Sequence, residues 1–418
     1  MISDSKDTIL LFGAGTGQLP YLRHFRQRGY RVAAIDRDPG APGATEADLF
    51  LAFSTHDDRA IRDGICAEKL QKRIAAVICP TTGWAYVSAA RIAAWLGVFF
   101  SSEAAALNIL DKFRLWQALN NAGLTRRKAW QYSHSADQNP DPDFPLVVKP
   151  QLAGGGHRGV NVAHGPNELP GLFQKAADVS LNGSVLLEEQ CLGHEIKLTG
   201  FIEQGRVVLM RVAQRTFGPG HPGVPVGLAF GGKENSDADM RTFIEQACAA
   251  LDLTTTSFNV DVIITATGPE LIDFDLALGN FQLLWQEAEG FSVPSAVADL
   301  ALGHRLKPPR NNGESVALTN LWLHLPQAVP AQRISTLYEQ QIKRGQSFIP
   351  APNWDPGSIL PAGLCRLGAL LSRAKRQQEA LIEGDRWLES IQKSGALEAG
   401  LEFQVLRPTR PFEFTIHS

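Results

Sequence analysis

The stretch Pro145-Leu-Val-Val-Lys149-Pro150, followed closely by Gly154-Gly155-Gly156-His-Arg-Gly159, decides the fold of this chain. The apolar run predicts a strand that ends at Lys149, and the glycines lie between it and the β-prone Val160 to Val162. This is the layout of a hairpin whose glycine-rich tip can close over phosphates with its backbone N–H groups. An ordinary glycine-rich hairpin has the same features, so the loop alone leaves both interpretations open.

A second hairpin, about a hundred residues on, carries three acids. Asn259-Val-Asp261-Val-Ile-Ile precedes a turn at Thr267-Gly268-Pro269 and the strand Leu271-Ile-Asp273-Phe-Asp275. Because side chains alternate along a strand, Asp273 and Asp275 share a face that Asp261 can join from the partner strand. Three adjacent carboxylates repel one another unless a cation neutralises them, and Mg²⁺ accepts such ligands while bridging ATP phosphates. The pattern favours a metal site over a solvated acidic face.

The composition predicts a multidomain globular protein. The chain has 418 residues, 44% of them hydrophobic, and a formal net charge of -3. A chain of that length is too long to fold around one ordinary hydrophobic core. The slightly negative net charge argues against a broad cationic surface for nucleic acid or anionic lipid. No apolar run suits a signal peptide or a bilayer span, so we expect a cytoplasmic protein without nucleic-acid or membrane partners. The oligomeric state stays open, with a homodimer among the options.

The first hundred residues predict a parallel α/β domain. Apolar strands and amphipathic helices alternate, beginning with strand Thr8 to Phe12, helix Leu19 to Arg28 and strand Arg31 to Ile35. The turn Gly13-Ala-Gly15-Thr-Gly17-Gln18, with Asp36 ending the second strand, weakly matches a dinucleotide-binding fingerprint. Gln18 stands where a third glycine is needed, so a simple tight turn is the better interpretation.

Two stretches with the polar, proline-containing composition of loops divide the rest of the chain. His134 to Pro142 has the composition of a loop, and Lys307 to Gly313 follows a helical pattern at Pro294 to Leu302. We therefore expect three domains, at residues 1–105, 106–306 and 307–418. The last domain is expected to contain an amphipathic helix from Leu370 to Gln392.

Other candidate ligands lie in the middle region. Asp111-Lys112 precedes a helical stretch that ends at Gly123, so Lys112 and Lys149 can approach one site, although a lysine at a strand end is usually only solvated. The apolar strand from Val185 runs into Glu188-Glu189-Gln-Cys191 and then Glu195. Such a connector can offer backbone groups to adenine, and Glu195 can accept ribose hydroxyls, while a solvated strand end is the alternative.

The order of these parts resembles the ATP-grasp superfamily, in the branch that has an N-terminal Rossmann-like domain and joins carboxylates to amines. The resemblance covers roughly residues 8 to 305. It implies an α/β protein with an N-terminal Rossmann-like parallel sheet, an α+β ATP-grasp domain and a small C-terminal lobe. It also implies that ATP and Mg²⁺ are the cofactors.

The resemblance assigns roles to individual residues. It implies that the two lysines and the glycine loop bind phosphates, that the hinge binds adenine, that Glu195 binds ribose and that the three aspartates hold the metal. The implied nucleotide ligands are Lys112, Lys149, Gly154, Gly155, Gly156, Glu188, Glu189, Cys191 and Glu195, and the implied metal ligands are Asp261, Asp273 and Asp275.

The chain departs from the family pattern at two places. Asp273 and Asp275 stand where the family usually has Glu and Asn, and both remain oxygen ligands. Ala277 stands where the family often has an arginine that steadies the acyl phosphate. Candidates for the missing cation, all in one polar and glycine-rich stretch, are Arg211, Arg215, His221 and Lys233.

The resemblance implies an enzyme that uses ATP to convert a carboxylate into an acyl phosphate, which an amine then attacks. An amino-acid or dipeptide ligase is the leading expectation, and a bicarbonate-using carboxylase of the purine-biosynthetic type is second. The expected partners are therefore small-molecule carboxylate and amine substrates. Two other classes stay open: a catalytically degenerate nucleotide-binding protein and a nicotinamide-dependent oxidoreductase.

Overall fold

The computed structural model describes most of the chain, as residues 7–133, 143–152, 159–218, 221–231, 238–309, 314–333, 335, 339, 347–350, 357–360, 362–399 and 404–408. The predicted loop at 134–142 and the glycines at 154–156 lie outside these ranges. Lys233 lies outside them as well.

The N-terminal part is a parallel sheet with the strand order β3-β2-β1-β4. Its strands are β1 (Thr8–Phe12), β2 (Arg31–Ile35), β3 (Leu49–Leu51) and β4 (Ile74–Ile78), and its helices are α1 (Leu19–Gln27), α2 (Asp58–Ala67) and α3 (Trp84–Leu96). All five residues of β1 are buried because helices cover both faces of the sheet. The predicted Rossmann-like domain is confirmed, with element ends within a few residues of those expected.

Two short helices connect this domain to a smaller antiparallel sheet. The helices are α4 (Glu103–Leu110) and α5 (Lys112–Asn121). The smaller sheet has the order β5-β8-β6-β7, with β5 (Ala129–Tyr132), β6 (Leu146–Pro150), β7 (Asn161–Ala163), β8 (Val185–Glu189) and the helix α6 (Leu169–Val179). Leu146, Val148, Leu187 and Phe173 form its core with the helix, so the apolar run around Lys149 is a central strand as predicted.

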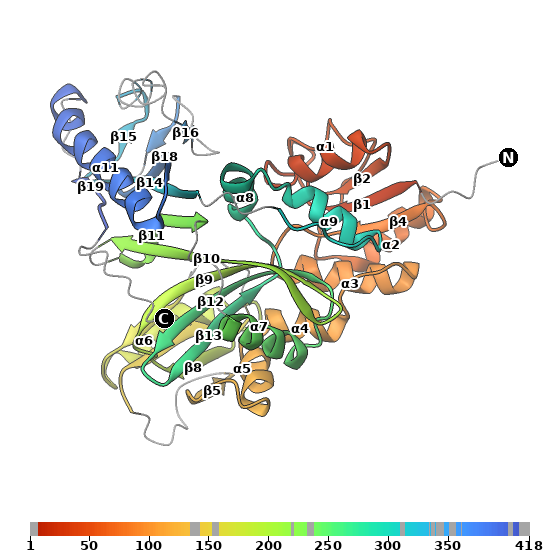
Figure 1. The fold of residues 1–418 in the computed structure, drawn as a ribbon, viewed down its shortest axis with the longest axis horizontal. Helices are drawn as coiled ribbons and strands as arrows, with labels where there is room; N and C mark the ends of the chain where they lie inside the picture. The colour runs from red at the N-terminus through yellow and green to blue at the C-terminus, as the bar shows by residue number, and fades with distance from the viewer. Residues whose placement is uncertain are drawn as a thin grey trace.

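A nine-stranded sheet runs through the rest of the molecule, in the order β13-β12-β9-β10-β11-β14-β18-β16, with β19 also paired to β14. Its strands are β9 (His194–Glu203), β10 (Arg206–Gly218), β11 (His221–Gly231), β12 (Thr256–Thr265), β13 (Gly268–Asp275), β14 (Ser315–Leu325), β16 (Ser347–Pro350), β18 (Gly363–Ala374) and β19 (Gln404–Val405). A separate pair joins β15 (Val329–Pro330) to β17 (Ile359–Leu360). The C-terminal strands therefore extend the same sheet that carries the acid hairpin (Figure 1).

Four further helices cover this sheet: α7 (Ala238–Ala250), α8 (Phe281–Glu289), α9 (Val293–Ala301) and α11 (Gln377–Ala399). Phe243 and Ile244 of α7 pack against Leu198, Val260 and neighbouring apolar side chains of the sheet. Trp285 of α8 and Val293 of α9 belong to a cluster that also includes residues of β1 and α1. The N-terminal domain and the large sheet thus share one apolar core.

The predicted helix from Leu370 to Gln392 is partly wrong. Residues up to Ala374 belong to β18, which pairs with β14 along its length, and the helix begins at Gln377. The run Leu367 to Leu371 is buried at every position, because Leu370 packs with Trp387 of α11 and Leu371 belongs to the cluster that contains Trp285 of α8. A short continuous apolar run does not distinguish a doubly buried strand from a helix, which explains the error.

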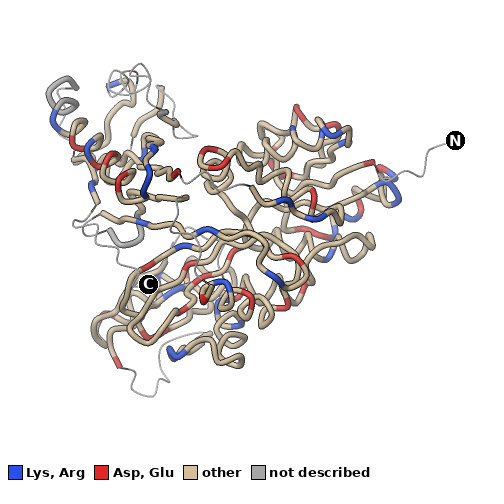
Figure 2. Tube along the Cα trace, viewed as in Figure 1, with Lys and Arg blue, Asp and Glu red and all other residues tan. Residues whose placement is uncertain are grey.

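Charged residues of both signs are mixed in each part of the described chain (Figure 2). This mixture agrees with the small formal net charge of -3. Among the described residues, no helix is both long enough and apolar enough to cross a membrane.

Candidate active site

The large sheet has one polar face, because the pairing register of its strands places charged side chains next to one another. Lys197 of β9, Asp261 of β12 and Asp273 of β13 lie directly opposite one another across three strands. Directly opposed residues in antiparallel strands share a face, so these side chains form one row. Asp261 therefore joins Asp273 on one face of the sheet, as the alternation of side chains predicted.

A second polar row runs parallel to the first, two residues further along each strand. It consists of Arg211 of β10, Thr199 of β9, Asn259 of β12 and Asp275 of β13. The intervening residues, such as Leu198 and Val260, point to the other face and pack under α7. The alternation therefore places the charged groups together on the face away from α7.

Lys112 brings α5 to this polar face. Asp111 caps the helix by accepting hydrogen bonds from the backbone N–H groups of Phe113 and Arg114. The Nζ atom of Lys112 lies 2.6 Å from Oδ1 of Asp273. Burial alone would raise the pKa of Asp273, but the Lys112 charge and hydrogen bond outweigh burial and lower that pKa to about 2. Asp273 is therefore ionised and paired.

The smaller sheet contributes a second buried group of charges. The Nζ atom of Lys149 on β6 lies 2.7 Å from Glu188 on β8, and the Arg127 guanidinium lies 3.4 Å from the same carboxylate. Burial lowers the pKa of Lys149, despite the nearby Glu188 charge. The pKa of Glu188 is lowered because Arg127 and Lys149 outweigh the effect of burial. The backbone N–H of Lys112 donates a hydrogen bond of 3.0 Å to the backbone oxygen of Gln151, just after β6, so the smaller sheet meets the polar face of the large sheet at Lys112.

A third group surrounds Asp261. Lys197 lies 2.5 Å from its Oδ1 atom, and the Arg215 guanidinium lies 3.4 Å from the same oxygen and 2.7 Å from Glu195. Glu195 is thus adjacent to the charged row, as the expected ribose ligand should be, but its carboxylate is already paired with Arg215. Lys197 is a residue that the sequence prediction missed. The sequence did contain a signal for it. Polar Glu195, Lys197 and Thr199 alternate with apolar Ile196 and Leu198, which is the pattern of a strand with one polar face.

Arg211 has a different environment from Arg215. Its guanidinium makes two hydrogen bonds, of 2.7 and 2.9 Å, to the fully buried Glu289 of α8. It also lies over the ring of Trp285, 5.2 Å from the centroid. Of these two candidate cations, Arg211 is held by α8, whereas Arg215 lies among the acids of the polar face.

Asp275 and Asn259 form the end of the second row. Burial raises the pKa of Asp275 to about 6, although the backbone N–H groups of Ala277 and Leu276 donate to its carboxylate. The Oδ1 atom of Asn259, directly opposite, is buried and has no hydrogen-bond partner among the residues that the structure describes. An orphaned amide oxygen next to buried carboxylates is a donor set of the type that Mg²⁺ accepts. Asn259 is a second residue that the sequence prediction missed.

The predicted metal ligands all have partners within the protein. Asp261 is paired with Lys197, Asp273 with Lys112, and Asp275 with backbone N–H groups. Within the described ranges, no three His, Cys, Asp or Glu side chains are gathered into a group that could hold a metal ion. Coordination of magnesium by these aspartates stays a prediction.

The remaining hinge residues lie at the end of β8. Glu189 follows Glu188 and so points to the opposite side of the strand, where it accepts a hydrogen bond from the backbone N–H of Lys128. Cys191 is half-buried, and burial raises the pKa of its thiol, which the Arg127 charge partly offsets. Gly159, at the end of the glycine loop, has φ +76, and a Cβ there would lie 3.0 Å from the Pro150 side chain. The backbone of His221 belongs to β11.

The glycine-rich turn after β1 is closed by its own side chains. The Oδ2 atom of Asp36 accepts a hydrogen bond of 2.9 Å from the backbone N–H of Ala14. The Gln18 side chain lies over the turn, 3.1 Å from where a Cβ on Gly13 would stand, and donates to the backbone oxygen of Pro80. The Gln18 side chain therefore occupies the space beside Gly13. Asp36 acts here as a structural cap for the turn.

Comparison with known proteins identifies the fold. An L-amino acid ligase from Bacillus licheniformis is 14% identical with a TM-score of 0.69, covering 96% of this chain and 99% of that one. A carboxyaminoimidazole ribonucleotide synthase from Aspergillus clavatus complexed with ATP is 15% identical with a TM-score of 0.70, covering 93% and 99%. A phosphoribosylglycinamide synthetase from Anaerococcus prevotii is 14% identical with a TM-score of 0.64, covering 96% and 100%.

The sequence itself matches no protein-family model and no curated protein. At identities of 14 and 15%, the similarity to the solved structures concerns the fold. This chain therefore shares its fold with those three proteins over nearly its whole length.

Proposed function

We propose that this chain, which has the ATP-grasp fold with an N-terminal Rossmann-like domain, is an ATP-dependent ligase that joins a carboxylate to an amine. The fold predicted from the sequence is confirmed by the comparisons. The activity is our inference from the polar face that the two sheets share.

The observation that carries the proposal is the convergence of three lysines on three acids, with two of the three pairs buried. Lys112 contacts Asp273, Lys149 contacts Glu188, and Lys197 contacts Asp261. Removing ion pairs from water is costly, and a fold rarely concentrates them for stability alone. A site that binds a polyanion needs such cations close to one another, which is why we assign them to the ATP triphosphate.

The paired arrangement suggests how the site takes up nucleotide. Lys112 and Lys149 exchange their carboxylates for phosphate oxygens when ATP binds. Asp273 and Asp275, with Asn259 Oδ1 beside them, are the residues that would hold Mg²⁺. When bound, the metal supplies positive charge that offsets the negative charge on the transferred phosphoryl group. The half-buried hinge around Cys191 receives the adenine, and Glu195 lies next to the site for the ribose.

The reaction needs no nucleophile from the protein. A substrate carboxylate oxygen attacks the γ-phosphorus of ATP, giving ADP and an acyl phosphate. The amine nitrogen then attacks the acyl carbon, the carbon–oxygen bond breaks, and phosphate leaves with a proton lost from nitrogen. Arg215, between Glu195 and Asp261, is the cation that we place against the acyl phosphate in place of an arginine at 277.

The first domain supports a ligase better than a nicotinamide-dependent oxidoreductase. Gln18 lies over the glycine-rich turn where a pyrophosphate would have to approach the backbone, and Asp36 is engaged by Ala14. Both features argue against a conventional dinucleotide-binding site at this turn.

Three versions of the proposal differ in substrate or in turnover. Similarity to an L-amino acid ligase favours amino-acid substrates, and similarity to a carboxyaminoimidazole ribonucleotide synthase favours a bicarbonate-using carboxylase. The engagement of Arg211 by Glu289 favours a degenerate nucleotide-binding protein. Phosphate release from ATP and Mg²⁺ separates these outcomes: dependence on amino acids supports the ligase, dependence on bicarbonate the carboxylase, and nucleotide binding without release the degenerate protein.

A further inference from the structure

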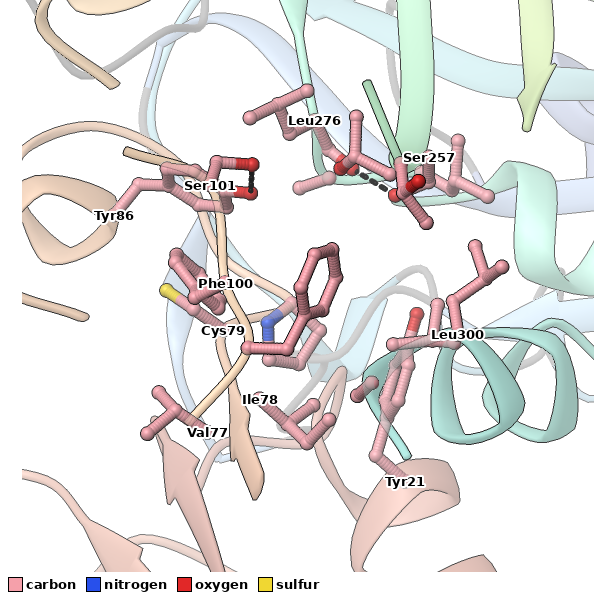
Figure 3. Close-up of a pocket in the computed structure, with 18 residues that line it drawn as sticks. Tyr21, Val77, Ile78, Cys79, Tyr86, Phe100, Ser101, Ser257, Leu276 and Leu300 are labelled. Atoms are coloured by element: carbon pink, nitrogen blue, oxygen red, sulfur yellow. Dashed lines mark hydrogen bonds between the residues drawn. The ribbon is translucent and has the colours of Figure 1, made fainter. Parts of the chain in front are cut away.

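A small apolar cavity lies where the N-terminal domain meets the end of the acid hairpin. Its volume is about 70 Å³. Ile78 at the end of β4, Phe100, Leu276 after β13 and Leu300 of α9 form parts of its wall (Figure 3). Its lining contains no Asp, Glu, Lys or Arg side chain. A charged group is therefore excluded from this cavity, because nothing there compensates its desolvation.

The Tyr21 hydroxyl is the unusual feature of this cavity. The Tyr21 side chain, which is 3% exposed, points into the space between the walls (Figure 3), and burial raises the pKa of its hydroxyl. The other ring hydroxyl in the wall, of Tyr86, is 3.1 Å from Ser101, and Ser257 donates to the Leu276 oxygen. The Tyr21 hydroxyl makes no hydrogen bond to any residue that the structure describes. Tyr21 therefore contributes a hydroxyl edge to a wall that is otherwise largely apolar.

The mouth of the cavity also carries an exposed aromatic side chain. Phe99 lines the cavity and is 47% exposed, one of the few large apolar side chains so exposed in the described chain. An exposed aromatic at the rim of an apolar recess is the arrangement of a ligand-binding site rather than of a closed core.

The cavity adjoins the charged site. A second cavity, of about 50 Å³, is lined by Lys112, Asp273 and Asp275, and it shares Tyr86 and Leu276 with the first. Leu276 and Ala277 directly follow Asp275 in the chain. A small ligand can therefore place a charged head group near Asp275 and an uncharged side chain in the apolar cavity.

We propose that the apolar cavity binds the side chain of an amino-acid substrate, and that this side chain is uncharged, mainly aliphatic and of about three to five non-hydrogen atoms. The size follows from scaling against a cavity of about 150 Å³ that holds benzene. Side chains of the valine, leucine and methionine class fit this description. This inference rests on the proposed ligase function, and it favours amino acids over bicarbonate, which has no side chain to bury.

The test narrows the cavity from α9, away from the charged residues. Ala301 lines the cavity, and Ala301→Leu should fill part of it. The matched control is Ala249→Leu, the same change at an exposed position of α7 outside the cavity. Phosphate release is measured with ATP, Mg²⁺ and either glycine or leucine as the varied amino acid. Excluding a leucine side chain from its pocket should raise KM for leucine at least about tenfold, and KM for glycine should stay within about twofold.

The opposite change provides a second variant if Ala301→Leu does not fold. Leu300→Ala enlarges the cavity and should improve KM for phenylalanine relative to leucine. Equal changes in KM for all amino acids, in either variant, would overturn the assignment of this cavity to the substrate side chain.

A binding measurement without ATP separates this inference from the proposed function. Leucine alone should raise the Tm of the wild-type protein more than glycine does, and this difference should disappear in Ala301→Leu. If no amino acid stimulates phosphate release but leucine still stabilises the wild type selectively, the ligase proposal fails and the cavity assignment stands. If leucine and glycine act alike on both proteins, the cavity assignment is wrong.

Discussion

The Nζ atom of Lys112 lies 2.6 Å from Oδ1 of Asp273, although 161 residues separate them in the chain. Lys112 begins α5, and Asp273 lies on β13 at the edge of the large sheet. Their contact joins the helix that precedes the smaller sheet to the strand that carries the predicted metal ligands. It therefore marks the point where the proposed phosphate ligands and the proposed metal ligands meet.

Replacing Lys112 tests its role at the triphosphate. Lys112→Met should lower ATP-dependent phosphate release by about 100-fold or more, because a cation positioned against the transferred phosphoryl group is lost. Nucleotide binding, measured by the ATP-induced rise in Tm, should weaken as well. The control is Lys175→Met, at an exposed position of α6. Wild-type turnover in the Lys112 variant would remove this lysine from the site.

Arg211 and Arg215 should respond differently to the same substitution. Arg211→Gln leaves the fully buried Glu289 without its partner, which should cost about 3 kcal/mol or more of unfolding free energy. In Arg215→Gln, Asp261 keeps its ion pair with Lys197, so the free energy of unfolding should change less. The kcat of this variant should fall by about 100-fold. Unfolding curves and steady-state kinetics on both variants check this contrast. The reverse pattern would assign the catalytic role to Arg211.

The stability of the protein in acid should depend on Glu188. Lys149 and Arg127 hold the folded-state pKa of Glu188 below its ordinary value of 4.5. A lowered carboxyl pKa contributes stability that is present above the unfolded-state value and is lost as the pH falls below it. Glu188→Gln has no such titration, so its Tm should be lower at pH 7 and fall less steeply between pH 5 and lower values. Parallel Tm profiles for the two proteins would contradict this account.

The glycine-rich turn should behave as a structural element. Asp36→Ala removes the acceptor of the Ala14 N–H, which is buried, and should cost about 1 to 3 kcal/mol of unfolding free energy. NADH should produce no rise in the Tm of the wild-type protein, whereas ATP with Mg²⁺ should. Stabilisation by NADH that is lost in Asp36→Ala would instead restore the dinucleotide interpretation.

The sequence predicted those parts of the fold where local pattern and burial agree. β1 and β2 are apolar after their first residues, Thr8 and Arg31, because helices cover both faces of the sheet. The hairpin of β12 and β13 alternates acids with apolar residues because only one of its faces is polar. The same alternation correctly placed Asp261 on the face that carries Asp273. These signals are local, so they can be interpreted without knowledge of the tertiary structure.

The parts that were missed depend on partners far away in the chain. Residues from Arg211 to Lys233 were interpreted as a polar, glycine-rich stretch, yet β10 and β11 form a long hairpin there that extends the sheet toward β14. Gly227 suits this strand because a Cβ there would lie 2.6 Å from the Thr216 hydroxyl. Arg127 was also missed, because its partners Glu188 and Glu270 lie on two different sheets. A local sequence pattern does not predict an ion pair between residues on different sheets.

Phosphate release from ATP and Mg²⁺ with pairs of amino acids, compared between the wild type and Asp273→Ala, tests the central claim most directly. Asp63→Ala, an exposed acid on α2, is the matched control. The account predicts release that depends on the amino acids in the wild type and the control and is lost in Asp273→Ala. Undiminished release in Asp273→Ala would contradict the assignment of the polar face as the site of ATP chemistry.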